Sequence, residues 1–206
     1  MKSTCQVFFV FDIETGGLNA ETDAILEIAA CPIDNELKDL PEYTTGIIKP
    51  STRLINAGAL KANGITKEQI EKGEEEKEAF EKFKNYLKSL KKGKSLPIPC
   101  GHNIDKFDLG FLFLWFAENG EDLDKYLNLD HTIDTLLRAR EVWPEATNYK
   151  LGTCCQSVGI SLTGAHRALS DALANKELLK YFLQGARGLR GKSATEEKRL
   201  RKTFEF

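Results

Sequence analysis

The sequence predicts an α/β domain in which helices flank a central mixed sheet of five strands. Three observations indicate this fold: two apolar segments near the N-terminus, a later alternation of short apolar runs with helical patterns, and acidic residues at the ends of apolar runs. Strands that come first and are then interleaved with helices are typical of a mixed sheet with helices on its faces. With 206 residues, the chain is long enough for one domain with a full hydrophobic core.

Two segments near the N-terminus favour a β-hairpin. Residues 6–13 and 24–33 are rich in apolar and β-branched side chains, and a stretch rich in turn-forming residues separates them. Apolar runs joined in this way are typical of paired antiparallel strands. Three further strands are expected at 42–48, 95–103 and 129–134.

Helical patterns fill much of the remaining chain. The clearest spans 74–90, where Phe80, Phe83, Leu87 and Leu90 recur at spacings of three and four residues. Further helices are expected at 54–62, after Thr66, and at 107–116, 135–142, 151–158 and 168–182. The longest apolar run, 109–117, is far shorter than the roughly 20 residues that cross a bilayer, so we predict a buried helix there and no membrane contact.

Charge and cysteine content narrow the class of protein. The formal net charge of -2 argues against a protein that coats nucleic acid through a basic surface, but it is compatible with an acidic cleft that grips a few nucleotides. The five cysteines are scattered, without the spacing of a zinc site or a disulfide framework. They are Cys5, Cys31, Cys100, Cys154 and Cys155. We expect small buried thiols in the cytoplasm or another reducing intracellular compartment.

The composition changes near the C-terminus, which predicts a domain at 1–184 and a basic tail at 185–206. The tail has few apolar residues and seven basic ones. These are Arg187, Arg190, Lys192, Lys198, Arg199, Arg201 and Lys202. We expect a solvated end without a specific partner, and an arm that contacts phosphates or docks on a protein is the alternative.

Asp12 and Glu14 follow an apolar run, at residues 8–11, near the end of the first predicted strand. Residues two apart on a strand point to the same face. Neighbouring carboxylates repel each other unless a cation lies between them, and carboxylate oxygens are ligands that Mg²⁺ or Mn²⁺ prefers. An isolated pair of this kind is most often a solvated surface pair, but a strand covered on both faces makes unpaired acids costly.

A third acid, Asp108, opens the apolar helix at 107–116. It precedes Phe111 and Leu112 by about one helical turn, which directs it towards the core side of that helix. The alternatives are an ordinary acid that complements the helix dipole and the nearby Asp105, which we expect in the connecting loop.

His166 and Asp171 lie five residues apart, which is about 140° around a regular helix. Both side chains therefore serve one site only if His166 lies on the loop before the helix. A histidine there, with a pKa near neutrality, is suited to removing a proton from an attacking water. An isolated histidine is more often structural, so the hypothesis depends on the acid that follows it.

Three blocks carry a family resemblance: FDIETGGL, GHNIDKFDLGFL and HRALSDALANKELL. Together they resemble the motifs of the DEDDh (DnaQ-like) superfamily of 3′ to 5′ exonucleases, which has a ribonuclease H-like fold. The resemblance extends over about residues 6–183. The spacing at 102–108 is closest to TREX-type members, but the proline-rich insertion and hydrophobic extension of some members are not found, so the subfamily stays open.

The resemblance also implies site residues. Two Mg²⁺ ions, for which Mn²⁺ substitutes, would be held by Asp12, Glu14, Asp108 and Asp171, with His166 as the general base. Substrate contacts would come from Thr15, Gly16, Leu18, Ile65 and Asn103. Three alternatives remain: Leu18 as an ordinary core residue beside a turn, the segment at Ile65 as the start of a helix that Thr66 caps, and Asn103 as a residue that fixes the loop carrying Asp108.

The implied function is a metal-dependent 3′ to 5′ exonuclease. It would release nucleoside 5′-monophosphates from single-stranded DNA or RNA 3′ ends, with DNA slightly favoured, by a mechanism in which two metal ions clamp the attacking and leaving oxygens. The alternatives are a proofreading-type subunit of a larger polymerase assembly and a catalytically silent nucleic-acid-binding module. The oligomeric state stays open.

Overall fold

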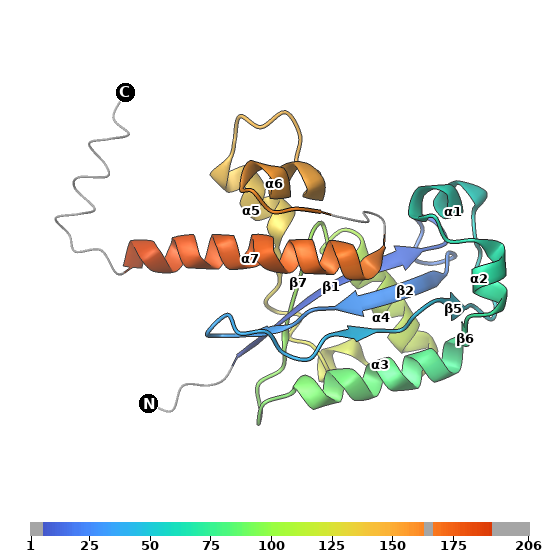
Figure 1. Ribbon diagram of the computed structural model, residues 1–206. Helices are drawn as coiled ribbons and strands as arrows, with labels where there is room; N and C mark the ends of the chain where they lie inside the picture. Colours follow the sequence, from blue (N-terminus) through green and yellow to red (C-terminus); the bar gives the residue numbers. More distant parts are fainter. Residues whose placement is uncertain (1–5, 163–166, 191–206) are drawn as a thin grey trace.

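The computed structural model describes residues 6–162 and 167–190, and a mixed sheet forms its centre (Figure 1). The main strands are β1 (Val7–Thr15), β2 (Ile25–Ala30), β4 (Tyr43–Thr44), β7 (Ile98–Gly101) and β8 (Ile133–Asp134). They lie in the order β4-β2-β1-β7-β8, and the short β3 (Ile33–Asp34) pairs with β1 as a sixth strand. β1 is antiparallel to β2 and parallel to β7. The predicted mixed sheet and its hairpin are thus confirmed.

The third predicted strand, 42–48, is divided. Its first part is β4, which pairs with β2, whereas β5 (Ile48–Lys49) pairs with β6 (Glu74–Glu75) in a separate two-stranded sheet. Gly46 lies between the two parts with a φ of 68°, a left-handed conformation that a strand does not adopt. The helix predicted from 74 consequently begins two residues later, after β6.

Helices occur at each predicted segment. They are α1 (Ala57–Asn63), α2 (Lys67–Glu71), α3 (Glu76–Leu90), α4 (Asp108–Glu118), α5 (Thr135–Val142), α6 (Leu151–Ser157) and α7 (Ala168–Arg190). A short 3-10 turn, Leu123–Lys125, follows α4. α7 continues past its predicted end at 182 and across the boundary predicted after 184. That boundary stays a prediction, and residues 191–206 of the predicted tail lie outside the described residues.

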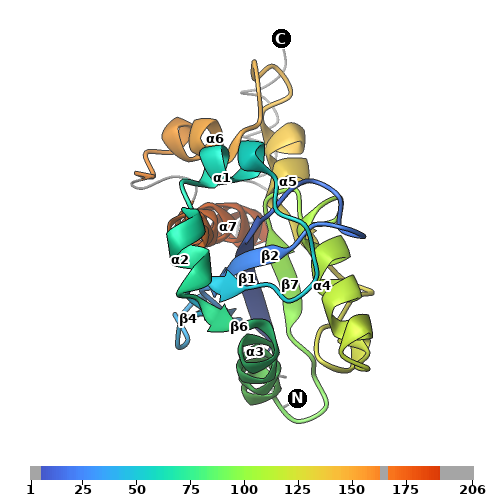
Figure 2. The ribbon, with the colours of Figure 1, turned by 90° about the vertical axis from the view of Figure 1, so that its right-hand side faces the viewer.

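Helices cover both faces of the sheet, with α7 on one face and α3 and α4 on the other (Figure 2). The alternation of β1 divides its side chains between these faces. Phe9, Phe11 and Ile13 pack with α3 and α4. Phe8 and Val10 instead belong to a cluster with Leu179 of α7. One strand therefore supplies both layers of the core.

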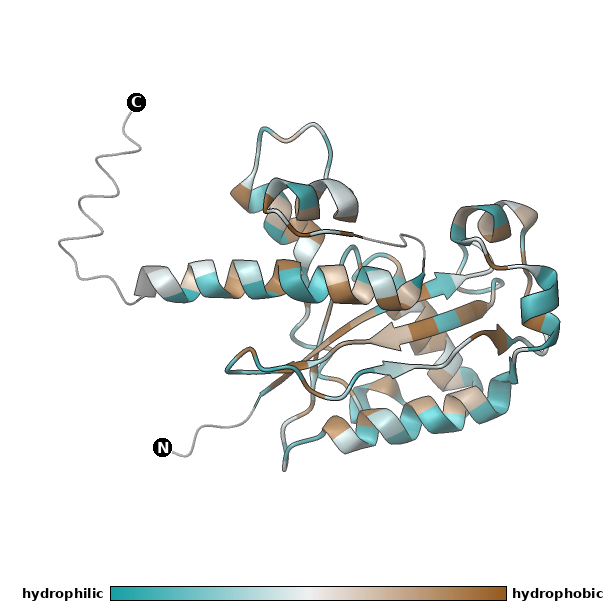
Figure 3. Ribbon diagram, viewed as in Figure 1, coloured by the Kyte–Doolittle hydropathy of each residue, from teal (hydrophilic) through white to brown (hydrophobic). Residues whose placement is uncertain are grey.

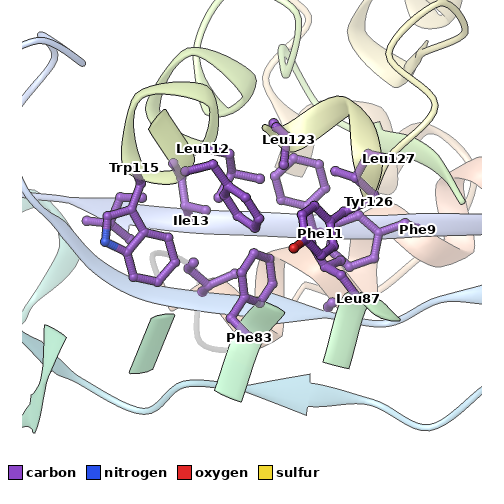
Figure 4. Packing of buried hydrophobic residues seen from close by; sticks show 14 of the residues in the cluster. Phe9, Phe11, Ile13, Phe83, Leu87, Leu112, Trp115, Leu123, Tyr126 and Leu127 are labelled. Atoms are coloured by element: carbon purple, nitrogen blue, oxygen red, sulfur yellow. The ribbon is translucent and has the colours of Figure 1, made fainter. Parts of the chain in front are cut away.

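The layer between the sheet and α3 and α4 is dominated by aromatic rings (Figure 4). Phe9 and Phe11 stack with ring centroids 4.9 Å apart, and Phe80 meets Trp115 edge to face at 5.1 Å. Figure 3 shows α3 as amphipathic, with apolar residues towards this layer and hydrophilic ones outside. Burial at about 25 cal/mol per Å² of apolar surface makes this layer the main source of stability.

The face towards α7 uses smaller residues. Ala29 and Cys31 of the β2 region pack against Ala168 and Ala172, so the first turns of α7 approach the sheet closely. The four cysteines in the described part of the chain are buried free thiols, as predicted, and Cys5 lies outside it. Among the described helices, none has the length and apolar character required to span a membrane.

Candidate active site

Three acidic side chains converge at the carboxyl end of β1. Asp12 and Glu14 come from this strand, and Asp171 comes from the first turn of α7. Each offers a carboxylate oxygen within 4.8 Å of those of the other two, and each is partly accessible to solvent. The register between β1 and β2 shifts between Glu14 and Thr15, directly after the acids. The structure thus brings together side chains from distant parts of the chain.

Asp108 is the first residue of α4 and lies against the same strand. Its side chain is only 4% exposed, and its carboxylate accepts a hydrogen bond from the backbone N–H of Ile13, the residue between Asp12 and Glu14. It is not part of the group within 4.8 Å, which among the described residues contains the other three acids. The rival Asp105 is exposed in the connecting loop.

The electrostatics of this group favour a bound cation. Burial raises the pKa of Asp12 well above its usual range, and the charges of Asp108 and Asp171 raise it further. Burial, followed by the charge of Asp171, raises the pKa of Glu14 to about 8. Burial also raises the pKa of Asp108 to about 7. Such carboxylates bind either protons or metal ions, and a set of oxygen donors suits Mg²⁺ or Mn²⁺.

His166, the predicted general base, lies outside the described residues. Its neighbour Arg167 and the start of α7 at Ala168 are described. The place of His166 before α7 and its role as general base both stay predictions.

A pocket of about 670 Å³ adjoins the acids. Its lining includes Glu14, Thr15, Leu18, Asn63 and Phe107. The Leu18 side chain is 87% exposed, which excludes the alternative that it is a core residue. The Asn63 side chain donates to the carbonyl of Thr15 at 3.2 Å and so holds the end of β1 against α1. The pocket has the size of a small-ligand site.

Ile65 does not line this pocket. Its side chain is 3% exposed and packs with Ala24, Leu26 and Ile70. The following residue, Thr66, forms a capping box at the start of α2, which confirms the alternative interpretation of this segment as a helix start. A contact between Ile65 and substrate stays a prediction that the burial of this side chain does not support.

Gly16 has a structural role of its own. Its N–H donates to the carbonyl of Ala24, and its carbonyl accepts from the N–H of Asn56, both at 2.7 Å. A Cβ atom at Gly16 would lie 2.6 Å from the carbonyl oxygen of Leu54, so close backbone packing requires glycine. Its predicted contact with substrate stays a prediction.

Asn103 adopts a left-handed conformation with a φ of 70°, and its N–H donates to Asp134 at 2.9 Å. The same carboxylate oxygen accepts from the N–H of Leu136 and so caps α5. Asp134 is 6% exposed and was not singled out from the sequence, although an acid directly before a helix is the usual signal for such a cap. It holds the loop that leads to Asp108.

Two further charged residues were missed, Glu27 of β2 and Arg167. Glu27 is 3% exposed, and both of its carboxylate oxygens accept hydrogen bonds from the Arg167 guanidinium. A single acid inside the apolar segment ILEIAA is a signal for a buried charge that requires a partner. His102 has a structural role, because its Nε2 donates to the carbonyl of Tyr149 at 2.7 Å and burial lowers its pKa.

The fold is shared with solved exonuclease structures. Escherichia coli exonuclease I in complex with a dT13 oligonucleotide superposes with a TM-score of 0.71 at 24% identity, over 85% of this chain and 40% of that one. The same enzyme with a dA16 oligonucleotide gives a TM-score of 0.74 at 23% identity, over 90% and 42%. These similarities show that the chain has the ribonuclease H-like fold of these structures.

Sequence relatives and a family match identify the family to which the chain belongs. The PolC-type DNA polymerase III of Bacillus cereus is 33% identical over 180 residues, which is 87% of this chain and 11% of the polymerase. That of Thermotoga maritima is 30% identical over 202 residues, or 97% and 13%. The chain thus spans only about a ninth of these relatives. The RNase_T exonuclease family matches residues 9–179, and the chain belongs to this family.

Proposed function

We propose that this protein is a metal-dependent 3′ to 5′ exonuclease that releases nucleoside 5′-monophosphates from single-stranded ends. The observation that carries the proposal is the convergence of Asp12, Glu14 and Asp171 within 4.8 Å, beside the buried Asp108 and an open pocket. Membership of the exonuclease family supports it. DNA is proposed as the preferred substrate because the similar exonuclease I structures contain dT13 and dA16 oligonucleotides.

Asp12, Glu14, Asp108 and Asp171 are the proposed ligands of two Mg²⁺ or Mn²⁺ ions. Bound divalent ions supply the positive charge that activates a water and stabilises a departing oxygen. The four side chains fit this role because all are hard oxygen donors. Burial raises the pKa values of the first three of these acids, and the charges of neighbouring ligands raise those of Asp12 and Glu14 further. A bound cation relieves that repulsion.

The remaining residues would orient the substrate and move its protons. His166 is proposed to accept the proton of the attacking water at a ring nitrogen. The pocket between Leu18 and Phe107 would take the terminal nucleoside, which must be unpaired to enter it. A reducing intracellular compartment is proposed as the place of action, since the described cysteines are buried thiols.

A time course on 5′-labelled single-stranded DNA and RNA oligonucleotides tests this function. With Mg²⁺ or Mn²⁺ we expect a ladder that shortens from the 3′ end, and we expect EDTA or Asp171→Ala to abolish it. Glu177→Ala is the matched control, because Glu177 is an exposed acid on the same helix and should be dispensable. Internal cleavage, or activity that persists in EDTA, contradicts the proposal.

A proofreading role is the second candidate, favoured by the PolC-type polymerases among the relatives. It predicts that the protein co-purifies with a polymerase and removes a mismatched 3′ primer end faster in that complex than alone. A catalytically silent binding module instead predicts that Asp12→Ala changes no measured behaviour. The oligonucleotide time course separates this last alternative from both enzymatic ones.

A further inference from the structure

A fifth acid lies directly beside the proposed metal ligands. In the antiparallel register of β1 and β2, Glu27 is the partner of Glu14, so both side chains lie on the face that α7 covers. Like charges at such paired positions destabilise a sheet. The charge of Glu27 accordingly raises the pKa of both Asp12 and Glu14. A buried carboxylate at this place needs a compensating partner.

The start of α7 supplies that partner. The Arg167 Nε donates to Oε2 of Glu27 at 3.1 Å and its Nη2 donates to Oε1 at 2.9 Å, which is the bidentate geometry of a strong arginine–carboxylate pair. The N–H of Ala168, the first residue of α7, lies 3.4 Å from Oε2. A negative charge at a helix N-terminus also complements the helix dipole. Glu27 thus fastens the end of α7 to β2.

The connection from Arg167 to the acidic group is short. The carbonyl of Arg167 accepts a hydrogen bond from the N–H of Asp171 at 3.1 Å, so the backbone of Arg167 defines the helical turn that carries Asp171. The positive charge of Arg167 also lowers the pKa of Glu14 in part. A displacement of Arg167 would therefore move Asp171 relative to Asp12 and Glu14.

We propose that Glu27 and Arg167 form a positioning pair that sets the place of Asp171 beside the two acids of β1. Neither residue contacts the reacting atoms; the pair acts through the first turn of α7. The kinetic part of this inference rests on the proposed exonuclease function, and the metal-binding part does not. Partners of metal ligands are typically worth about 10- to 100-fold in metal affinity or activity.

Two other roles for Arg167 make different predictions. Its side chain is 48% exposed, so a direct contact with a substrate phosphate is one alternative. Loss of that contact would raise KM and leave Mn²⁺ affinity unchanged. A purely electrostatic effect is the other alternative, and removal of its positive charge beside the acids would then strengthen Mn²⁺ binding. A positioning role predicts weaker Mn²⁺ binding, because Asp171 is displaced.

The test uses the full chain with Glu27→Gln, Arg167→Met and the double variant. We expect each single variant to lower kcat and Mn²⁺ affinity by about 10- to 100-fold, with KM for a single-stranded oligonucleotide changed less than about 2-fold. The double variant should resemble the worse single variant, because both substitutions break one interaction. Arg167→Lys keeps the positive charge but cannot form the bidentate pair with Glu27. It should retain a higher kcat than Arg167→Met.

An exposed pair on α5 provides the control. Arg138 and Glu141 form an ion pair at 2.8 Å, and Arg138→Met or Glu141→Gln should leave kcat and Mn²⁺ affinity unchanged. Circular dichroism and thermal unfolding verify that each variant is folded. If Glu27→Gln does not fold, Arg167→Met still tests the inference, because the Arg167 side chain is half-exposed. Tighter Mn²⁺ binding in Arg167→Met, a change in KM alone, or additive losses overturn the inference. An inactive wild type overturns the proposed function, while Mn²⁺ calorimetry still decides the inference.

Discussion

The two faces of β1 differ in what they contribute to the protein. The odd-numbered residues, such as Phe9 and Phe11, enter an aromatic layer in which rings stack or meet edge to face. Two even-numbered residues near the end of the strand, Asp12 and Glu14, enter a group of acids whose charges oppose one another. Neighbouring residues therefore face environments of opposite character.

The difference shows where the stability of this domain is concentrated. The aromatic layer gains free energy by burying apolar surface, whereas the acidic face loses free energy through repulsion and desolvation until a cation binds. The unfavourable electrostatics of the acidic face are tolerated because the opposite face of the same strand buries a large apolar cluster. Stability and chemistry should consequently respond to different substitutions along one strand.

The largest effects on stability and activity are expected from substitutions of two adjacent residues of β1, Phe11 and Asp12. Asp12→Asn should lower exonuclease activity on the order of 10³-fold or more, because a proposed metal ligand is lost, without lowering the free energy of unfolding. Phe11→Ala should lower the free energy of unfolding by about 3–5 kcal/mol, because Phe11 is 1% exposed in the aromatic layer. Urea unfolding and oligonucleotide cleavage at low temperature measure both. A loss of stability in Asp12→Asn equal to that in Phe11→Ala would break the comparison.

A smaller effect is expected in how the free energy of unfolding depends on pH. The pKa of about 8 for Glu14 in the folded protein lies above its ordinary value of 4.5. Between these values the folded state binds more protons than the unfolded state, so metal-free stability should fall as the pH rises from about 4.5 to about 8. Glu14→Gln should raise the free energy of unfolding by about 0.5–2 kcal/mol near pH 8 and leave it unchanged near pH 4.

Urea unfolding in EDTA across this pH range measures the effect of Glu14→Gln. The matched control is Glu75→Gln, since the Glu75 side chain is exposed on β6 and pairs with an exposed lysine. Addition of Mn²⁺ should stabilise the wild type more than Glu14→Gln, with a larger gain at high pH, because metal and protons compete for the same oxygens. A wild type that becomes more stable as the pH rises through this range would contradict the prediction.

Much of this architecture is predictable because its causes are local. Alternation along β1 places Asp12 and Glu14 on one face, and helical spacing distinguishes the buried Asp108 from the exposed Asp105. The bounds of α5 agree with the prediction because Asp134 caps it at its start. In such segments the deciding interactions lie within a few residues of one another.

The features that were missed depend on distant contacts. Glu27 and Arg167 are 140 residues apart, so their pairing follows from how α7 docks on β2. The division of the third strand likewise depends on the pairing of β5 with the distant β6. Gly46 is a local signal for this break, because glycine favours the left-handed conformation found there. Leu18 and Ile65 are both aliphatic residues near turns, so the local sequence does not distinguish them. Tertiary packing decides that Leu18 is exposed and Ile65 is buried.

The smallest expected effects distinguish these two aliphatic residues. Leu18→Ala should leave stability unchanged and raise KM several-fold, which corresponds to about 1 kcal/mol, because this exposed side chain borders the pocket. Ile65→Val should lower the free energy of unfolding by about 0.5–1.5 kcal/mol and leave KM unchanged, because its side chain packs with Leu26 of β2. Steady-state kinetics and urea unfolding on the same samples measure both. A higher KM in Ile65→Val without a loss of stability would contradict this prediction, because a buried residue would then contribute to substrate binding. The separation between exposed binding residues and buried stabilising residues would not hold at the edge of the pocket.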